Sequence, residues 1–512
     1  MKRIESRAAG GSAVGLLSTV LSLAQAIVQV PLLLSYWSVD VFGLWAGVNA
    51  AVVLLIATDF GHQAFLGNSF CRLWVEDRKK LQTEVASGVR VAVALAVLEF
   101  ACGLALVCSG RLSWLVPNSG SLPSSSSVTG AFLLYMGFWV LNGSVGGILV
   151  RLYLPAGYFI RGQWLGIGMR LSGFLAIIGS VMAGASIFGA MAAQVVALTV
   201  LNGLVFMDLR RRMPEVYPWW RGGNWATAWH NFRTSLVLTA NGIAEQLAGN
   251  GLVLLVGRML SPGAVALFTT VRTVANAALQ GTGVLLNPVV PDMVRYHIQG
   301  AGAKLGTVFA ANWLLSNTLI AAGLAVGVLV LEPVYTLWTR GRMPLDRSLF
   351  AALGLAVAIR QWAAPCQTYL ASINRLRPQS TMAVARAALG LGTAGVLLPW
   401  LGLPAAGLGV LAAEVGAAVV AVRAARAELL RFGTAFPSRS ARLALAQLGL
   451  AAVVLGAFAA RVPGLGGWSG AALVGVCVLG WQQWCGLSDD MRTRLRSLAE
   501  PLRRRFQHRF SS

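Results

Sequence analysis

The sequence predicts an all-α integral membrane protein with about 14 transmembrane helices, and its composition is the first reason. Hydrophobic residues make up 56% of the 512 residues, charged residues only 12%, and the mean hydropathy is +0.69. So little charge cannot cover the surface of a soluble globular protein. The second reason is that apolar stretches of the roughly 20 residues needed to cross a bilayer recur along the whole chain.

Fourteen such stretches follow one another, each closed by a polar, glycine-containing or proline-containing break. The first two are separated only by Ser38-Val39-Asp40, which predicts two helices joined by a tight turn. The predicted spans are residues 11 to 34, 42 to 65, 88 to 108, 130 to 150, 164 to 184, 187 to 208, 234 to 257, 265 to 288, 307 to 331, 349 to 371, 382 to 401, 404 to 422, 443 to 460 and 468 to 487.

Basic residues fall on alternate connections between these spans, which predicts the orientation of the chain. If the N-terminus is inside, the inner segments hold 30 of the 41 lysines and arginines and the outer segments hold six. Inner loops carry this excess in most membrane proteins. We therefore expect a multi-pass protein of the cell (inner) membrane with both termini cytoplasmic, and the net charge of +23 reflects topology rather than nucleic-acid binding.

The chain also contains an internal repeat with an offset of 223 residues. The segment from Ser261 to Phe268 is a weaker copy of the segment from Ser38 to Trp45, and Leu254-Leu255-Val256 lies opposite Leu32-Leu33-Leu34 at an offset of 222. The repeat predicts two pseudo-symmetric six-helix bundles around a central cavity, plus two C-terminal helices. The predicted organisation is an N-terminal bundle (1–210), a cytoplasmic linker (211–232), a C-terminal bundle (233–425), two extra transmembrane helices (426–487) and a basic cytoplasmic tail (488–512).

Two motifs carry a resemblance to a known family. The stretch from Pro31 to Gln63 reads as an apolar run, a short turn, Phe42-Gly43-Leu44-Trp45, a second apolar run and Asp59-Phe60-Gly61, and Asn287-Pro288-Val289-Val290-Pro291-Asp292 closes the eighth span. Together with the number of spans, they resemble the Wzx-type polysaccharide or lipid-linked oligosaccharide flippases. These belong to the multidrug/oligosaccharidyl-lipid/polysaccharide (MOP) exporter superfamily, with the MurJ-type lipid II flippases and the MATE drug exporters.

The resemblance implies a function. Such a flippase translocates a polyprenyl-pyrophosphate-linked oligosaccharide across the cytoplasmic membrane by alternating access, for the synthesis of O-antigen, capsule or exopolysaccharide. The expected partners are the polyprenyl-linked glycan, membrane lipids, and the polysaccharide polymerase and glycosyltransferases of the same pathway. The alternative within transport is a MATE-like cation-coupled multidrug exporter, and a membrane glycan polymerase or glycosyltransferase is a further alternative.

An enzymatic function finds little support in the sequence. The four histidines lie in different segments, the six cysteines form no CxxC pair, and neither a Walker A loop nor a G-x-S-x-G motif occurs. We therefore expect no catalytic residue, no cofactor and no metal site.

Charged residues within the predicted spans are the main candidates for function. A charge at the centre of a membrane helix costs roughly 2.5 to 3.5 kcal/mol on insertion scales, so it usually faces a polar cavity or a partner. Arg272 and Arg360 are predicted to bind the pyrophosphate, since the planar guanidinium group donates two parallel hydrogen bonds to phosphate. The alternative is that each arginine is paired with Glu245 and merely neutralises it.

The remaining candidates are acidic or amide residues. Glu245 and Asp59 are assigned to coupling or to a structural ion pair, and Asp59 is expected to cap or anchor its helix terminus. In the family that this chain resembles, the first and seventh helices face the cavity, which favours Gln25, Gln29 and Asn241 as sugar contacts. The alternative for these amides is that they hold neighbouring helices together.

Overall fold

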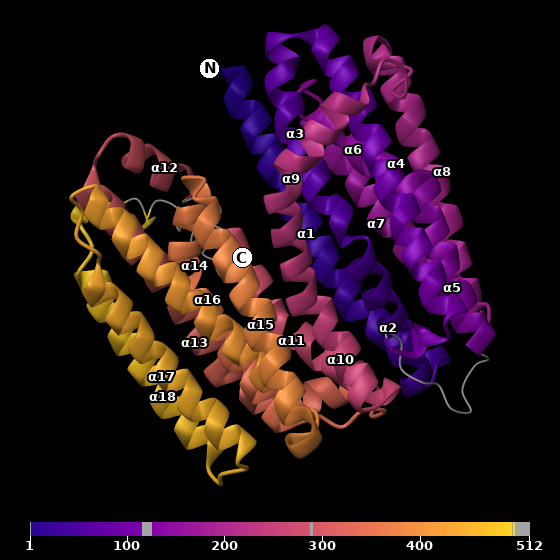
Figure 1. The fold of residues 1–512 in the computed structure, drawn as a ribbon. Coiled ribbons are helices and arrows are strands. Elements are labelled where there is room, and N and C mark those ends of the chain that lie inside the picture. Colours follow the sequence, from indigo (N-terminus) through magenta and orange to yellow (C-terminus); the bar gives the residue numbers. More distant parts are fainter. Residues whose placement is uncertain (1, 115–124, 287–289, 494, 497–512) are drawn as a thin grey trace, which may run out of the picture. The chain divides into compact units, whose positions relative to one another are not determined.

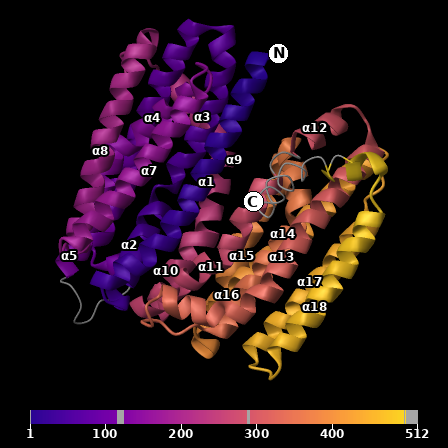
Figure 2. The same ribbon diagram turned by 180° about the vertical axis from the view of Figure 1, so that it is seen from behind.

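The computed structural model of the 512-residue chain describes residues 2–114, 125–286, 290–493 and 495–496, and these residues form helices joined by short connections, without β-strands. The chain divides into two compact units (Figures 1 and 2). The first unit contains Met1–Thr273, Tyr335–Leu345 and Arg386–Gly409; the second contains Val274–Val334, Asp346–Ala385 and Val410–Ser512. The predicted division at 211–232 follows the sequence repeat rather than these contacts, and it stays a prediction.

The first unit is built mainly from the N-terminal half of the chain. Its helices are α1 (Lys2–Tyr36), α2 (Val39–Leu55), α3 (Ala57–Glu76), α4 (Arg78–Cys108), α5 (Ser125–Phe138), α6 (Ser144–Leu149), α7 (Phe159–Met182), α8 (Ile187–Arg212), α9 (Trp225–Gln246), α10 (Leu252–Met259) and the first part of α11 (Pro262–Leu286). The ends of three later helices complete it.

The second unit holds most of the C-terminal half. Its helices are α12 (Val290–Ile298), α13 (Gly302–Trp338), α14 (Arg347–Ser372), α15 (Leu376–Leu401), α16 (Pro404–Arg431), α17 (Ser438–Ala459) and α18 (Leu465–Cys485), of which α13, α15 and α16 extend partly into the first unit.

Over its described residues, each of the fourteen predicted spans lies on a helix or on a helix interrupted by a break, which confirms the fold class. Among the described residues, 11 helices are long and apolar enough to cross a membrane, and α2 and α3 add a twelfth span that bends by 51°. The predicted span at 265 to 288 is not among them, and neither is the one at 234 to 257. There, α9 carries several polar residues, and the π-helical turn Leu247–Gly251 separates it from α10.

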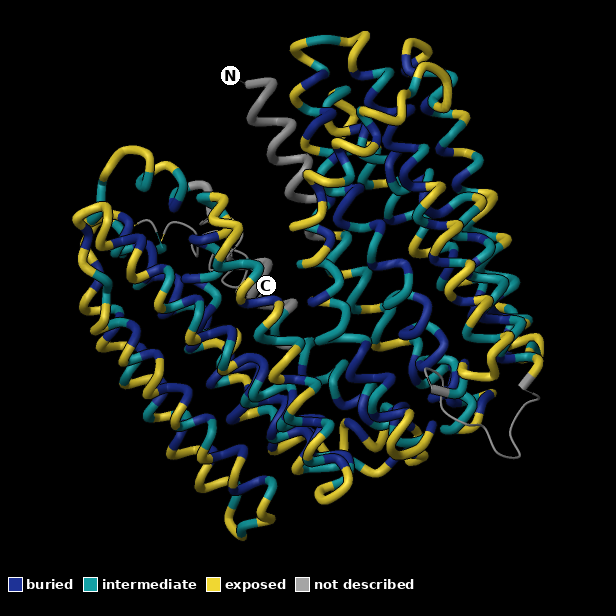
Figure 3. Tube along the Cα trace, viewed as in Figure 1, coloured by how far each residue is buried: buried dark blue, intermediate teal, exposed yellow. Residues whose placement is uncertain are grey.

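The surface composition agrees with a bilayer environment. Figure 3 shows exposed positions recurring along outer helices such as α18. Many of these positions hold large apolar side chains, including Leu175, Val196, Val474 and Trp481. Exposing this many apolar groups to water would be unfavourable in free energy, whereas contact with lipid chains is not.

The two copies of the internal repeat contact each other in the first unit. Ser38 and Ser261, which are equivalent by the 223-residue offset, each accept a hydrogen bond from a backbone N–H three residues later and so begin α2 and α11. A Cβ atom on Gly43 would lie 1.8 Å from the carbonyl oxygen of Pro262, and one on Gly263 would lie 2.9 Å from Oδ1 of Asp40. Glycine is therefore required at position 43, where the neighbouring atoms belong to the backbone.

Helices α3 and α9 are also in close contact. A Cβ atom on Gly61 would lie 2.2 Å from the backbone nitrogen of Thr239, so only a glycine allows the two backbones to approach this closely. Around the C-terminal half of α3, the side chains of Leu66, Phe70, Tyr153 and Leu209 form a buried core with α4 and α8.

The core of the second unit is organised around two tryptophans. The indole nitrogen of Trp313 on α13 donates a hydrogen bond to the carbonyl oxygen of Trp362 on α14 (2.8 Å). The indole of Trp362 in turn donates to the carbonyl oxygen of Ala441 on α17 (3.1 Å). Small buried residues on α16, such as Ala417 and Ala421, allow this helix to pack closely against the same core.

Several sequence features lie outside the described residues, in whole or in part. They are residues 287–289 of the Asn287–Asp292 motif, residues 115–124 of the serine-rich outer connection, and most of the basic tail at 488–512.

Candidate functional site

Arg360 lies on α14 in the second unit, where its guanidinium group forms an ion pair. Its Nη1 atom lies 3.6 Å from Oε1 of Glu414 on α16. The glutamate side chain is buried, with 8% exposed, whereas the arginine side chain is 52% exposed. The arginine thus has an acidic neighbour other than the Glu245 expected from the sequence, and it still presents about half of its surface to surrounding molecules.

Arg272 lies on α11 in the first unit and is bound to the interrupted helix beside it. Its Nη1 donates a hydrogen bond to the carbonyl oxygen of Gly249 (2.9 Å), and the guanidinium group lies over the ring of Phe268 at 5.8 Å. Gly249 belongs to the π-helical turn between α9 and α10, where the backbone departs from regular α-helical bonding. Arg272 therefore stabilises a break in the helix.

The other predicted contacts lie on α1 and α9. Gln25, Gln29 and Asn241 are half-buried, and their side-chain amides make no hydrogen bond among the described residues. Glu245 is exposed and forms no ion pair with any residue that the structure describes. Their roles as sugar contacts or coupling groups stay predictions.

Asp59 lies in the first turn of α3, directly after the 51° bend. It is fully buried, and its Oδ2 accepts a hydrogen bond from Nε2 of Gln63 (2.7 Å), while Oδ1 has no hydrogen-bond partner among the described residues. Negative charge in the first turn of a helix interacts favourably with the exposed N–H groups there. The anchoring role expected from the sequence stays a prediction.

A line of buried polar groups continues from Asp59 along α3, α4 and α9. Thr58 donates a hydrogen bond to Glu99 on α4, and Nδ1 of His62 lies 3.3 Å from Oγ of Ser235 on α9. Thr239, next on α9, is also buried. Sequence reasoning missed His62 and Ser235, because the hydropathy of a single helix does not reveal which of its polar residues meet those of another helix.

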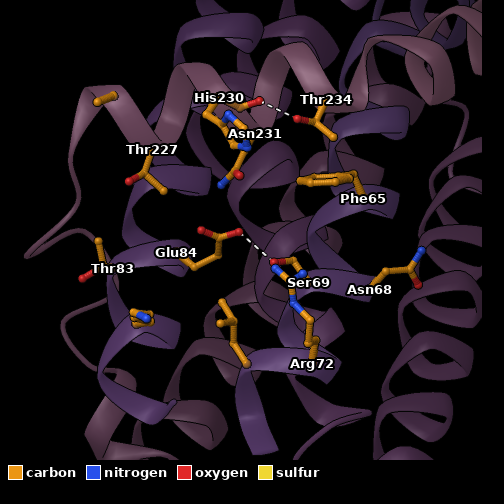
Figure 4. Close-up of a pocket in the computed structure, with 13 residues that line it drawn as sticks. Phe65, Asn68, Ser69, Arg72, Thr83, Glu84, Thr227, His230, Asn231 and Thr234 are labelled. Atoms are coloured by element: carbon orange, nitrogen blue, oxygen red, sulfur yellow. Dashed lines mark hydrogen bonds between the residues drawn. The ribbon is translucent and has the colours of Figure 1, made fainter. Parts of the chain in front are cut away.

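This polar line leads to a pocket of about 830 Å³ at the ends of α3, α4 and α9 that the charge distribution predicts to be cytoplasmic (Figure 4). Ten of its 13 lining residues have polar side chains, although most of the lining surface is apolar. The lining residues are Phe65, Asn68, Ser69, Arg72, Leu73, Lys80, Thr83, Glu84, Ala226, Thr227, His230, Asn231 and Thr234. All of them belong to the first unit.

Two helix caps shape this pocket. Asp77 accepts hydrogen bonds from the backbone N–H groups of Lys79 (3.0 Å) and Lys80 (3.1 Å), and so turns the chain from α3 into α4. The hydrogen bond from the backbone N–H of Lys80 is the main reason why the pKa of Asp77 lies below its usual range. Asn224 caps α9 through the N–H of Thr227, and its own N–H donates to Oγ of Ser87 (3.0 Å). The start of α9 is thereby fixed beside α4.

The side chains of Ser69, Glu84 and Asn231 point into the same space (Figure 4). The hydroxyl group of Ser69 donates a hydrogen bond to Oε1 of Glu84 (2.8 Å). Glu84 is 8% exposed and Asn231 is 4% exposed, and Nδ2 of Asn231 has no hydrogen-bond partner among the described residues. A buried amide without a partner costs free energy unless a ligand or water binds it, so this pocket is suited to a polar ligand.

Comparisons with known proteins add evidence on the fold. No protein-family profile matches the sequence, and no curated protein matches it. Among solved structures, an inward-facing MATE-family multidrug resistance transporter of the MOP superfamily is similar over 81% of this chain and 95% of its own, with 14% identity and a TM-score of 0.62. A MOP superfamily transporter from Pyrococcus furiosus is similar over 84% of this chain and 96% of its own, with 13% identity and a TM-score of 0.55.

The lipid II flippase MurJ, in an inward closed conformation, is similar over a larger part of the chain. The similarity covers 92% of this chain and 97% of MurJ, with 10% identity and a TM-score of 0.61. Similarity at such low identity concerns the fold alone. From these matches we conclude that the chain is a multi-pass membrane protein with the fold of the MOP superfamily, which its MATE transporters share with the lipid II flippase MurJ.

Proposed function

We propose that this protein is a flippase that moves a polyprenyl-pyrophosphate-linked oligosaccharide across the cytoplasmic membrane. In this proposal both termini are cytoplasmic, and transport proceeds by alternating access without nucleotide hydrolysis. The observation that carries the proposal is the extent of the similarity to the lipid II flippase fold. Residues 1–437, which precede α17, make up 437 of 512 residues, or about 85% of the chain, so a match over 92% is longer than this part and includes residues that follow it.

The MATE structures cover less of this chain. Their similarity covers 81% and 84% of this chain and 95% and 96% of their own length. The larger covered share supports the choice of a lipid flippase over a drug exporter in our proposal. In this proposal, the two C-terminal helices shelter part of the long polyprenyl chain beside the second unit.

The charges of the helices support the same choice. An exporter of cationic drugs needs carboxylates that face its ligand, whereas a glycan pyrophosphate needs cations. Arg360 is about half exposed, while its partner Glu414 is buried. The guanidinium group is therefore more accessible to a ligand than the carboxylate, which favours an anionic substrate.

A reconstitution experiment tests the function. Purified protein in proteoliposomes should move a fluorescent polyprenyl-diphosphate glycan between leaflets, measured by its accessibility to an added glycosidase. Protein-free liposomes give the background rate, and efflux of a cationic dye under an imposed proton or sodium gradient tests the drug-exporter alternative. Dye efflux without glycan translocation would reject the proposed function.

A further inference from the structure

The pocket between α3, α4 and α9 has a buried floor and an exposed, basic rim. Glu84 and Asn231 are among its buried residues, whereas the side chains of Arg72 and Lys80 are 67% and 76% exposed. A ligand with a neutral polar part and an anionic part could therefore place the polar part on the floor and the anionic part at the basic rim.

The floor has the chemistry that recognises sugar hydroxyl groups. A hydroxyl group both donates and accepts hydrogen bonds. The carboxylate of Glu84 accepts, and Nδ2 of Asn231 is a buried donor without a partner among the described residues. The ring of Phe65 forms part of the wall, and an aromatic ring can pack against the apolar face of a sugar (Figure 4). Adjacent hydroxyl groups of one sugar could bind Glu84 and Asn231 together.

The rim has the chemistry that recognises phosphate. Arg72 and Lys80 lie 3.8 Å from Glu76 and 3.7 Å from Asp77, respectively, and all four side chains are substantially exposed. Exposed ion pairs at such distances contribute little stability, so a doubly charged diphosphate group can replace the carboxylates at little cost.

We propose that this pocket is a loading site that binds the glycosyl diphosphate head group of the lipid-linked substrate before translocation. The sugar next to the diphosphate would lie on Glu84 and Asn231, and the diphosphate would lie between Arg72 and Lys80. The pocket volume of about 830 Å³ is large enough for a short glycan. This inference rests on the proposed function, because it names where that substrate first binds.

Two soluble probes separate the two halves of the proposed site. One is a short-chain prenyl diphosphate that bears a single sugar, tested with glucose, galactose and N-acetylglucosamine, and the other is the same prenyl diphosphate without sugar. Binding of each to the full-length protein in nanodiscs is measured by titration calorimetry. The variants are Glu84→Gln, Asn231→Ala and the double change Arg72→Gln with Lys80→Gln. The control is Arg211→Gln with Arg221→Gln, which removes two exposed basic residues outside the pocket lining.

The proposal predicts a different pattern for each half. Glu84→Gln and Asn231→Ala should each weaken the best sugar-bearing probe about tenfold and leave the sugar-free probe unchanged, as expected when a buried polar group loses its ligand contact. The rim double variant should weaken both probes about tenfold, and the control should weaken neither by more than about twofold. Asn231→Ala removes no internal hydrogen bond of the described residues, so it separates ligand binding from folding.

Other patterns overturn the proposal. If the floor variants weaken neither probe, or both equally, the pocket does not recognise a sugar. If only the sugar-free probe and an anionic phospholipid bind, and both depend on Arg72 and Lys80, the pocket is an ordinary lipid head-group site.

The transport assay separates this inference from the proposed function. If the wild-type protein translocates no lipid-linked glycan, the proposed function itself fails. Suppose that the wild type translocates the glycan and that the floor variants reach half of their maximal rate at the same substrate density in the membrane as the wild type. In that case only the loading site is rejected. If the floor variants raise that density about tenfold with little change in the maximal rate, the pocket acts in substrate binding.

Discussion

At the scale of single residues, Arg360 could bind the substrate or could only neutralise Glu414, and the pair that they form allows the two roles to be tested. The pair is asymmetric, because the carboxylate is buried and the guanidinium group is about half exposed. A buried carboxylate that loses one of its partners is destabilising, by about 1 to 3 kcal/mol. Loss of activity in Arg360→Ala alone would therefore not distinguish the two roles.

We predict that the double change Arg360→Ala with Glu414→Gln restores the membrane abundance lost in Arg360→Ala but not glycan translocation. Neutralising the glutamate removes the cost of its missing partner, whereas no cation is regained for the pyrophosphate. The measurement is translocation at matched protein density, with Arg360→Lys expected to keep part of the activity. Restored translocation in the double variant would show that Arg360 only neutralises Glu414.

A second prediction concerns Asp208 on α8, which is the centre of a structural cluster. It accepts a hydrogen bond from the hydroxyl group of Tyr153 (2.7 Å), two from Arg161 (2.7 and 2.9 Å) and one from Arg212 (3.0 Å). Asp208→Asn removes the charge that orders both arginines, so it should lower the free energy of unfolding by about 1 to 3 kcal/mol.

The matched control for Asp208 is Glu215→Gln. Glu215 forms one exposed pair with Arg78 (3.2 Å), and such pairs contribute about 1 kcal/mol or less. Both variants are compared with the wild type by thermal unfolding in the same detergent. Equal stability of the two variants would show that the cluster around Asp208 has no structural role.

At the scale of helices, the contact between α3 and α9 positions both the polar line and the pocket. We predict that Gly61→Ala separates the two helices, because the new methyl group would meet backbone atoms of Thr239 that cannot move aside. Overpacking of this kind costs about 1 to 3 kcal/mol. Gly166→Ala on α7 is the control, since nothing lies within 4 Å of its added Cβ atom. Thermal unfolding of both variants tests the prediction, and equal melting temperatures would contradict it.

The sequence predicted the helices well because most membrane spans are long apolar runs that hydropathy detects. It did not predict the π-helical turns at Trp139–Gly143 and Leu247–Gly251, since one extra residue in a helical turn leaves the apolar run unchanged. The bend between α2 and α3 was also missed, because the apolar run continues across it. Helix breaks of this kind depend on tertiary contacts, as the hydrogen bond from Arg272 to Gly249 illustrates.

The candidate site was harder to predict than the fold. Arg360 was identified correctly as a charged residue within a span, but its acidic neighbour is Glu414 rather than the expected Glu245. The pocket was missed altogether, because Glu84 and Asn231 come from opposite sides of the sequence repeat and neither lies in the middle of a predicted span. Only the packing of α4 against α9 brings these two residues together.

At the scale of the whole molecule, the charge distribution makes a topological prediction. Reporter fusions at Ser121, Asn224 and Ser512 should report outside, inside and inside, because the predicted inner segments carry 30 basic residues and the outer segments six. The measurement pairs a reporter active only in the cytoplasm with one active only outside it. A tail at Ser512 that is accessible from outside would contradict the orientation and would also place the proposed loading pocket on the wrong side.

The internal repeat makes the last prediction, since its two copies meet at the ends of α2 and α11 that are predicted to face outward. Asp40 and Gly263 are equivalent by the 223-residue offset, and a Cβ atom on Gly263 would lie only 2.9 Å from the Asp40 side chain. Rocking of two repeats about a pseudo-symmetry axis requires these ends to separate when the transporter opens outward. A covalent link between them should therefore stop the transport cycle.

To test this, Asp40→Cys and Gly263→Cys are introduced into a chain without its six native cysteines and treated with a short bifunctional thiol reagent that a reductant can cleave. Cross-linked protein should lose glycan translocation almost completely and recover it on reduction, because the outward-open state becomes unreachable. Each single-cysteine variant, treated in the same way, should keep its activity and so controls for modification of the surface. Full translocation by fully cross-linked protein would exclude separation of the two repeats at this contact, and the glycan would then have to cross without an outward opening between α2 and α11.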